Sequence, residues 1–388
     1  MKILALNKIS DIIYTQLPKE CYAVSPDEAA PEAVLVRSAS MHEMAVPDSL
    51  LAVARAGAGV NNIPVPDYTK RGICVFNTPG ANANAVAELV VLGMLMSGRK
   101  VVDGIEWAKG LKGQADVPKL VEKGKGEFVG PELRGKTLGI IGLGAIGVLV
   151  ANAAANGLGM NVAGIDPFMS VDHAWSLTPG VKKAGSLEEL LAASDFVSVH
   201  VPLNDKTRNM FDAALLAKMK PGACLLNYSR AEIVEGDALR AAIAGGRLST
   251  YVVDFPTDDM IGVKGVICIP HLGASTPESE ENCAVMAAAQ LRDYLEKGAI
   301  RNSVNLPEIE LGKPEGARVM VIHANAPGLV NQISGVLSGK NINIEHMVCK
   351  SRGDIGVSVL DLGEAPDGAA LAELAALEQV TRVRLITA

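Results

Sequence analysis

The chain of 388 residues has no excess of basic charge and no closely spaced cysteines. Its 36 Lys and Arg against 43 Asp and Glu give a net charge of −7. This balance argues against nucleic-acid binding, which usually needs a basic face. The six cysteines are scattered without a C-x-x-C pair, which indicates reduced packing residues in a cytoplasmic protein. No group of potential ligands has the spacing of a metal site, so we expect no metal.

Long hydrophobic runs are also missing. The N-terminal apolar run is too short for a signal peptide and indicates a first strand. Residues 137–165 carry no charge, but they include seven glycines and three asparagines and change pattern midway. We therefore expect a strand, a turn, a helix and a second strand there, and no membrane helix.

Short apolar segments alternate with turns and helical patterns along most of the chain, which predicts an α/β fold with two doubly wound parallel sheets. Strands are expected at 3–6, 34–36, 51–54 and 74–76, followed by one long helix over 84–109 and a loop over 111–133. A denser series of strands and helices starts at residue 137 and ends with a strand at 266–269.

Residues 304–316 are rich in Pro, Gly and charged residues and are expected to form a linker. The order of strand and helix patterns changes after this segment. Residues 317–388 predict a βαββαβ module of the ferredoxin-like type.

A dinucleotide fingerprint follows the strand that begins the second series. Gly142, Gly144 and Gly147 form a G-x-G-x-x-G turn into a helix, and the next strand ends at Asp166. The glycines permit a tight turn, close approach of a pyrophosphate and close helix packing. The carboxylate suits the ribose hydroxyls and would repel a 2′-phosphate, so the pattern favours NAD over NADP.

Three polar groups follow other strands of this series. His271 can accept a hydroxyl proton as hydride leaves the same carbon, and Arg230 can hold a carboxylate. Asp258 or Asp259 could bond to the His271 ring and orient it. Taken singly, each has an ordinary structural explanation; their joint position at strand ends, where ligands of such sheets bind, favours catalysis.

With these motifs, residues 1–305 resemble the D-isomer-specific 2-hydroxyacid dehydrogenases. The matching segments, in order, are 55–62, 77–82 with 86–88, 142–147 with Asp166, 200–203, 227–230 and 270–273. The resemblance implies a discontinuous substrate domain at 1–95 and 275–303 around an NAD-binding domain at 96–274. It implies Arg230, Asp258 and His271 as catalytic residues. The cofactor residues implied are Gly142, Gly144, Ala145, Ile146, Gly147, Asp166, His200, Val201, Pro202, Thr207, Ser229, Asp254 and Gly273.

The chain departs from the family pattern at several positions. The carboxylate segment is one residue shorter and ends in Asp258 where the family has Glu, with Asp259 as the second candidate. Tyr228, Ala231 and Asn61 also replace the usual residues. None of these changes removes the chemistry.

The resemblance also implies a substrate and an effector. Members of the family that act on 3-phosphoglycerate bind the substrate's phosphate at the positions of Arg37, Ser38 and Lys125. The backbone of Ala58, Gly59 and Val60 would bind the substrate's carboxylate. Residues 317–388 resemble an ACT domain, in which His323, Asn325 and Asn343 would bind an amino acid such as L-serine. Such modules usually pair, so we expect a homo-oligomer and specifically a tetramer.

Two alternatives remain open at this point. One is a dehydrogenase of the same family with another D-2-hydroxy acid as substrate. The other is a regulator that senses NADH without turnover, which the altered carboxylate segment would suit.

Overall fold

The computed structural model describes residues 1–387 and divides into two compact units. Unit 1 comprises Met1–Ala81 with the chain from Glu280 onward, and unit 2 comprises Asn82–Ser279. The sequence placed the two crossings at residues 95–96 and 274–275. The first of these positions falls inside a helix, which belongs to unit 2 as a whole because its Val90 and Met94 pack into the core of that unit.

Unit 1 contains a five-stranded parallel sheet in the order β2-β1-β3-β4-β5. Its strands are β1 (Lys2–Leu6), β2 (Ala23–Ser25), β3 (Ala33–Val36), β4 (Ala52–Arg55) and β5 (Cys74–Phe76). Helix α1 (Val65–Lys70) precedes β5, and the long helix α10 (Pro277–Lys297) returns the chain to this sheet. The four apolar strands were expected; β2 was not, because its three residues carry too little pattern.

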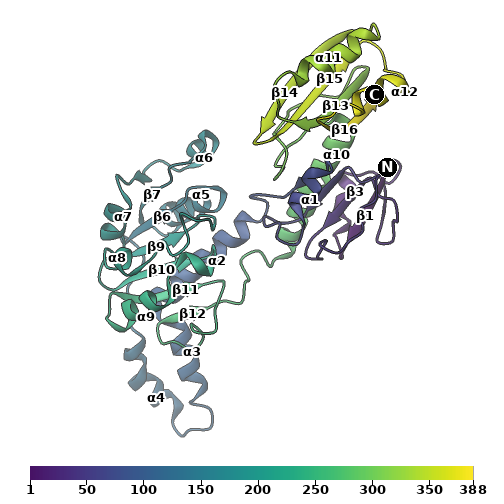
Figure 1. The fold of residues 1–388 in the computed structure, drawn as a ribbon. Helices are drawn as coiled ribbons and strands as arrows, with labels where there is room; N and C mark the ends of the chain where they lie inside the picture. The colour runs from purple at the N-terminus through teal and green to yellow at the C-terminus, as the bar shows by residue number, and fades with distance from the viewer. Residues whose placement is uncertain (388) are drawn as a thin grey trace. The chain divides into compact units, whose positions relative to one another are not determined.

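A second sheet of unit 1 is antiparallel, in the order β14-β15-β13-β16 (Figure 1). Its elements are β13 (Ala317–Ala324), α11 (Leu329–Gly339), β14 (Ile344–Arg352), β15 (Ile355–Leu362), α12 (Gly368–Ala375) and β16 (Val380–Thr387). The expected βαββαβ module is confirmed. Its two faces differ: Val319 and Val321 pack under α11 and α12, whereas Met320 and Ile322 join the core of the first sheet.

Unit 2 holds a seven-stranded parallel sheet in the order β12-β11-β10-β9-β6-β7-β8. Its strands are β6 (Thr137–Ile141), β7 (Asn161–Ile165), β8 (Lys182–Lys183), β9 (Phe196–Val199), β10 (Ala223–Asn227), β11 (Leu248–Val253) and β12 (Val266–Cys268). Its crossover helices are α5 (Ala145–Asn152), α6 (Val171–Ser176), α7 (Leu187–Ala193), α8 (Ala213–Leu216) and α9 (Gly236–Ala244). The order reverses between β6 and β9, which is where doubly wound sheets bind ligands. The expected α/β class is confirmed.

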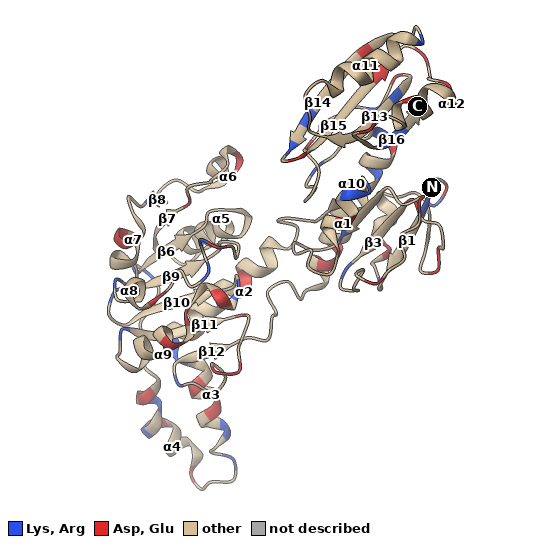
Figure 2. Ribbon diagram, in the orientation of Figure 1, with Lys and Arg blue, Asp and Glu red and all other residues tan. Residues whose placement is uncertain are grey.

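The helical segment before β6 differs from its prediction. The single helix expected over 84–109 is two helices, α2 (Ala83–Arg99) and α3 (Val101–Lys109), separated by Lys100 in a left-handed conformation at φ 47°. The loop expected at 111–133 contains α4 (Val117–Gly124) and a short 3-10 turn, Lys125–Phe128. The ring of Phe128 packs 5.3 Å from that of Trp107, which joins this turn to α3. Helices α3 and α4 carry charges of both signs (Figure 2).

No helix in the described chain combines the length and the hydrophobicity needed to cross a membrane.

Candidate active site

Close backbone contacts require two of the three glycines in the turn between β6 and α5. Gly142 has φ 93°, and a Cβ there would lie 2.5 Å from the carbonyl oxygen of His200. A Cβ on Gly147 would lie 2.0 Å from the carbonyl oxygen of Gly142. A Cβ on Gly144 would meet no atom within 4 Å, so the middle glycine borders open space. No side chain caps α5, and the N–H groups of Ala145 and Ile146 in its first turn are the natural donors to a pyrophosphate.

Asp166 is tied to this turn. One carboxylate oxygen accepts the N–H of Leu143 and the other accepts the N–H of Phe168, both at 2.8 Å. A carboxylate oxygen accepts more than one hydrogen bond, so both retain capacity for ribose hydroxyls. The glycine turn, the open space at Gly144 and this acid therefore fit the adenosine and pyrophosphate parts of NAD.

The next two strands of the sheet end in further cofactor candidates. After β9, the His200 ring lies 2.8 Å from the Ser198 hydroxyl, and burial lowers the pKa of His200 to about 4. The ring is therefore neutral at pH 7, which suits a neighbour of the cofactor and not the catalytic base. The Val201–Pro202 segment follows His200, and the Pro202 carbonyl accepts a hydrogen bond from the Thr207 hydroxyl at 2.6 Å. After β10, the Ser229 hydroxyl donates to the Val199 carbonyl at 2.9 Å.

Asp254 follows β11 and fixes the loop that carries His271. It is 2% exposed and accepts the N–H groups of Leu272 at 2.8 Å and Gly273 at 2.9 Å. Burial raises the pKa of Asp254, while those two N–H groups and His271 act in the opposite direction. A Cβ on Gly273 would lie 2.8 Å from the Asp254 carboxylate. This clamp holds His271 in a left-handed conformation at φ 54°.

Arg230 and His271 are brought together through an aromatic ring. The Arg230 guanidinium lies 4.8 Å from the centre of the Phe255 ring, and the rings of Phe255 and His271 are 4.3 Å apart. Arg230 also donates to the Ser229 carbonyl at 2.7 Å. The sequence reasoning missed Phe255, although an aromatic residue directly after Asp254 was a usable signal. The structure thus places both catalytic candidates in contact with one ring.

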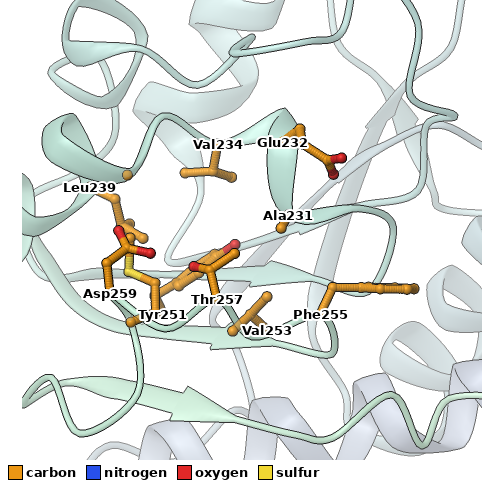
Figure 3. Close-up of a pocket in the computed structure, with 11 residues that line it drawn as sticks. Ala231, Glu232, Val234, Leu239, Tyr251, Val253, Phe255, Thr257 and Asp259 are labelled. Carbon is orange, nitrogen blue, oxygen red and sulfur yellow. The ribbon is translucent and has the colours of Figure 1, made fainter.

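The two candidate carboxylates have different surroundings. Asp259 pairs with Arg240 on α9, and its hydrogen bonds from Thr257 and Arg240 lower its pKa. Figure 3 shows Asp259 on the Leu239 side of a cavity of about 170 Å³, while the Phe255 ring extends from the opposite side. Asp258 is exposed and forms no hydrogen bond or ion pair with the residues that the structure describes. Within the described chain, neither carboxylate is hydrogen-bonded to His271. Asp259 is already paired with Arg240, whereas Asp258 has no ion pair among residues 1–387.

The phosphate candidates lie in both units. In unit 1, the Asn7 side-chain oxygen accepts the N–H groups of Arg37 at 3.3 Å and Ser38 at 3.0 Å, which fixes the end of β3. The Arg37 guanidinium pairs with Glu280 of α10. In unit 2, Lys125 pairs with Glu122 at 2.5 Å on an exposed helical turn, where nothing marks an anion site.

The predicted carboxylate-binding loop of unit 1 is held by two hydrogen bonds. The carbonyl of Ala58 accepts the side-chain amide of Asn77 at 2.6 Å, and the carbonyl of Gly57 accepts the N–H of Thr78 at 3.1 Å. These bonds fix the start of the segment Ala58, Gly59 and Val60. Its N–H groups remain the candidates for binding an anion.

The effector candidates do not meet within one chain. His323 is 6% exposed, and its ring nitrogens lie 2.8 Å from the Ser358 hydroxyl and 2.7 Å from the Ala324 carbonyl. Asn325 donates to the Gly353 carbonyl at 3.0 Å. Asn343 precedes Ile344, which lies level with Ala317, whereas His323 is at the other end of β13. Six residues of strand separate the two levels by about 20 Å, so only a second chain could bring Asn343 to His323.

Comparison with known proteins identifies two domains. Residues 92–273 match the NAD-binding domain of the D-isomer-specific 2-hydroxyacid dehydrogenases, and residues 317–379 match the ACT domain. The chain is 33% identical to D-3-phosphoglycerate dehydrogenase of Haemophilus influenzae over 349 residues, which cover 87% of this chain and 81% of the relative. The enzyme of the same name from Escherichia coli is 33% identical over 352 residues, with 87% and 82% covered.

Solved structures agree with this result. Apo D-mandelate dehydrogenase of Rhodotorula graminis has a TM-score of 0.67 at 25% identity, covering 81% of this chain and 99% of that one. The NAD⁺-bound 3-phosphoglycerate dehydrogenase of Entamoeba histolytica has a TM-score of 0.58 at 26% identity, with 79% and 98% covered. The expectations of family, enzyme class and NAD as cofactor are confirmed. The chain belongs to the D-isomer-specific 2-hydroxyacid dehydrogenases, acts as an NAD-dependent dehydrogenase on a CH–OH group, and carries a C-terminal ACT domain.

Proposed function

We propose that the chain oxidises 3-phospho-D-glycerate to 3-phosphohydroxypyruvate, the first step of L-serine biosynthesis. The names of its relatives support this substrate. The observation that carries the chemistry is the grouping of Arg230, Phe255 and His271 at the strand ends beside the glycine turn.

Each residue has a defined part in this proposal. His271 accepts the proton of the C2 hydroxyl, and Arg230 holds the substrate carboxylate with the N–H groups of 58–60. The turn at Gly142, Gly144 and Gly147 together with Asp166 would hold NAD, which would supply the hydride acceptor. Arg37 and Ser38 bind the phosphate, and Lys125 is a weaker candidate for the same charge. Asp258 is the carboxylate assigned to assist His271, because Asp259 is paired with Arg240.

One assay tests the reaction and its base. Purified enzyme with NAD and 3-phosphoglycerate should produce NADH, and D-glycerate should be a poorer substrate. His271→Ala should lower kcat by about 10²- to 10⁴-fold, since that is the usual contribution of a general base. NADH binding, followed by fluorescence, should persist in this variant. Near-normal turnover of His271→Ala would exclude it as the base, and exclusive turnover of an unphosphorylated acid would replace the substrate.

The ACT domain supports a further part of the proposal, inhibition by L-serine at a site completed by a second chain. His323 and Asn325 are at one end of the sheet and Asn343 at the other, so two paired modules could bring them together. We expect millimolar L-serine to lower activity and Asn343→Ala to weaken its binding in calorimetry. Allosteric coupling is typically about 1–3 kcal/mol. If wild-type enzyme neither binds serine nor changes its activity, the module serves assembly only.

The exposed apolar side chains of unit 2 support an oligomer. On α2 and α3, exposed fractions are 46% for Leu92, 40% for Leu95, 41% for Val101 and 51% for Ile105. Exposed apolar side chains on two consecutive helices are suited to contact with a second copy of the chain. Pairing here and at the ACT domain would give a tetramer, which light scattering would detect.

A further inference from the structure

Three charged side chains meet at the carboxyl edge of the parallel sheet in unit 1. Arg37 follows β3, Arg55 ends β4 and Glu280 is in the first turn of α10. The Arg37 guanidinium pairs with the Glu280 carboxylate, and both side chains are 43% exposed. The edge therefore presents two cations and one anion.

Arg55 is held close to this pair by the backbone. Its Nε donates to the Arg37 carbonyl at 3.0 Å. A Cβ on Gly57 would lie 2.5 Å from an Arg55 nitrogen, so the guanidinium lies against the loop that begins the 58–60 segment. Cys283 lies one turn along α10 from Glu280, and all three charges affect the pKa of its thiol. Burial raises that pKa, Arg37 and Arg55 lower it, and Glu280 raises it.

The ion pair affects any anion that would bind Arg37. Glu280 is tethered on the same unit, so it competes with a high effective concentration. A phosphate that displaced it would also face a nearby carboxylate and be repelled. Exposed ion pairs are weak, so this competition reduces the affinity of Arg37 for an anion by about two- to five-fold, and an anion can still bind there.

We propose that Glu280 is a specificity-determining residue that competes with the substrate's phosphate for Arg37 and so narrows the preference for phosphorylated over unphosphorylated 2-hydroxy acids. This rests on the proposed function for the identity of the substrate. A free inorganic phosphate and the phosphate of a 2-hydroxy acid must both displace Glu280 from Arg37, so both meet the cost of breaking one exposed ion pair. An unphosphorylated 2-hydroxy acid does not displace Glu280 and meets none of this cost.

The test compares Glu280→Gln with Glu281→Gln. Glu281 is the next residue of α10, is exposed and forms no ion pair with the residues that the structure describes. Glu280→Gln should lower both KM for 3-phosphoglycerate and Ki for inorganic phosphate by about two- to five-fold. KM for D-glycerate should not change, and Glu281→Gln should match wild type in all three constants.

A double variant removes the remaining ambiguity. In an Arg37→Ala background, adding Glu280→Gln should have a much smaller effect on the phosphate constants, because the competition needs Arg37 and only the direct repulsion by the carboxylate is left to relieve. The proposal is overturned if Glu280→Gln leaves phosphate affinity unchanged, or if it weakens it, since Glu280 would then support Arg37. Calorimetric binding of inorganic phosphate to the intact variants needs no turnover. If 3-phosphoglycerate is not a substrate, tighter phosphate binding by Glu280→Gln that depends on Arg37 still supports the competition.

Discussion

Polar side chains near the candidate site and in the ACT domain take their hydrogen-bond partners from nearby loops and strands, as Asp254 and His323 do. Asp254 and Gly273 were expected at the cofactor, yet in the structure they bond to each other and fix the His271 loop. His323 was expected to bind an effector, yet both ring nitrogens already have partners. Sequence gives the position after a strand, but the backbone N–H or carbonyl that satisfies a polar group is set by the folded loop.

His200 provides a pH test at this scale. Its folded-state pKa of about 4 lies below the ordinary value of 6.5. As the pH falls, His200 therefore binds a proton in the unfolded state before it does so in the folded state. The contribution of neutral His200 to the free energy of unfolding is complete above pH 6.5 and is lost as the pH falls towards 4. The ring is partly exposed, so we expect a loss of about 1–2 kcal/mol between pH 7.5 and 5. In urea unfolding, His200→Gln should lose that much less than wild type over this interval; equal losses would contradict the assignment.

At the scale of elements, the strands were predicted better than the helices that flank them. Buried parallel strands are nearly continuous apolar runs, as in β9 and β10, and such runs are readable from sequence. The two-residue strand β8 has only exposed lysines and gives no such signal. The left-handed conformation of Lys100 has no signal in the local pattern. The contact between Trp107 and Phe128 joins residues too far apart in the sequence for a local pattern to predict.

The glycine turn gives a prediction that separates folding from cofactor binding. Gly144→Ala meets no protein atom within 4 Å, so its melting temperature should stay within about 2 °C of wild type. The added methyl group occupies the space assigned to the pyrophosphate, so Kd for NADH should rise about ten-fold or more. Fluorescence titration measures this.

Gly147→Ala is the contrasting variant. Its methyl group would meet the Gly142 carbonyl, so the free energy of unfolding should fall by about 1–3 kcal/mol. Gly157→Ala, where a Cβ meets nothing within 4 Å, is the neutral control. Unchanged NADH affinity in Gly144→Ala would show that the pyrophosphate does not approach this glycine.

Across unit 1, the ACT domain and the parallel sheet share one hydrophobic core. Met320, Ile322, Val357 and Val359 of the antiparallel sheet belong to the same buried cluster as residues of α10 and of β1, β3, β4 and β5. Arginines of the ACT domain also donate to carbonyls outside it. Arg318 bonds to Lys297 at 2.7 Å, and Arg384 bonds to Tyr294 at 2.8 Å while lying over the Tyr294 ring. Burial lowers the pKa of Arg384. An effector bound to the ACT domain would therefore act on the parallel sheet through a packed core and not through the 304–316 linker alone.

This shared core predicts that the ACT domain cannot be removed without loss of stability. Deleting residues 317–388 would uncover Leu291, Tyr294 and Leu295, which are at most 1% exposed in the full chain. Each fully buried apolar side chain of this size is worth about 1.5–3 kcal/mol relative to exposure, and a domain's net stability is only about 5–15 kcal/mol. We expect the truncated chain to aggregate and to bind hydrophobic dyes. In the full chain, Ile322→Asp should lower the melting temperature, because it places a charge in this core, whereas Lys350→Asp on exposed β14 should not. A truncated chain that stays soluble, melts at the wild-type temperature and keeps full activity would show that the two sheets are energetically independent.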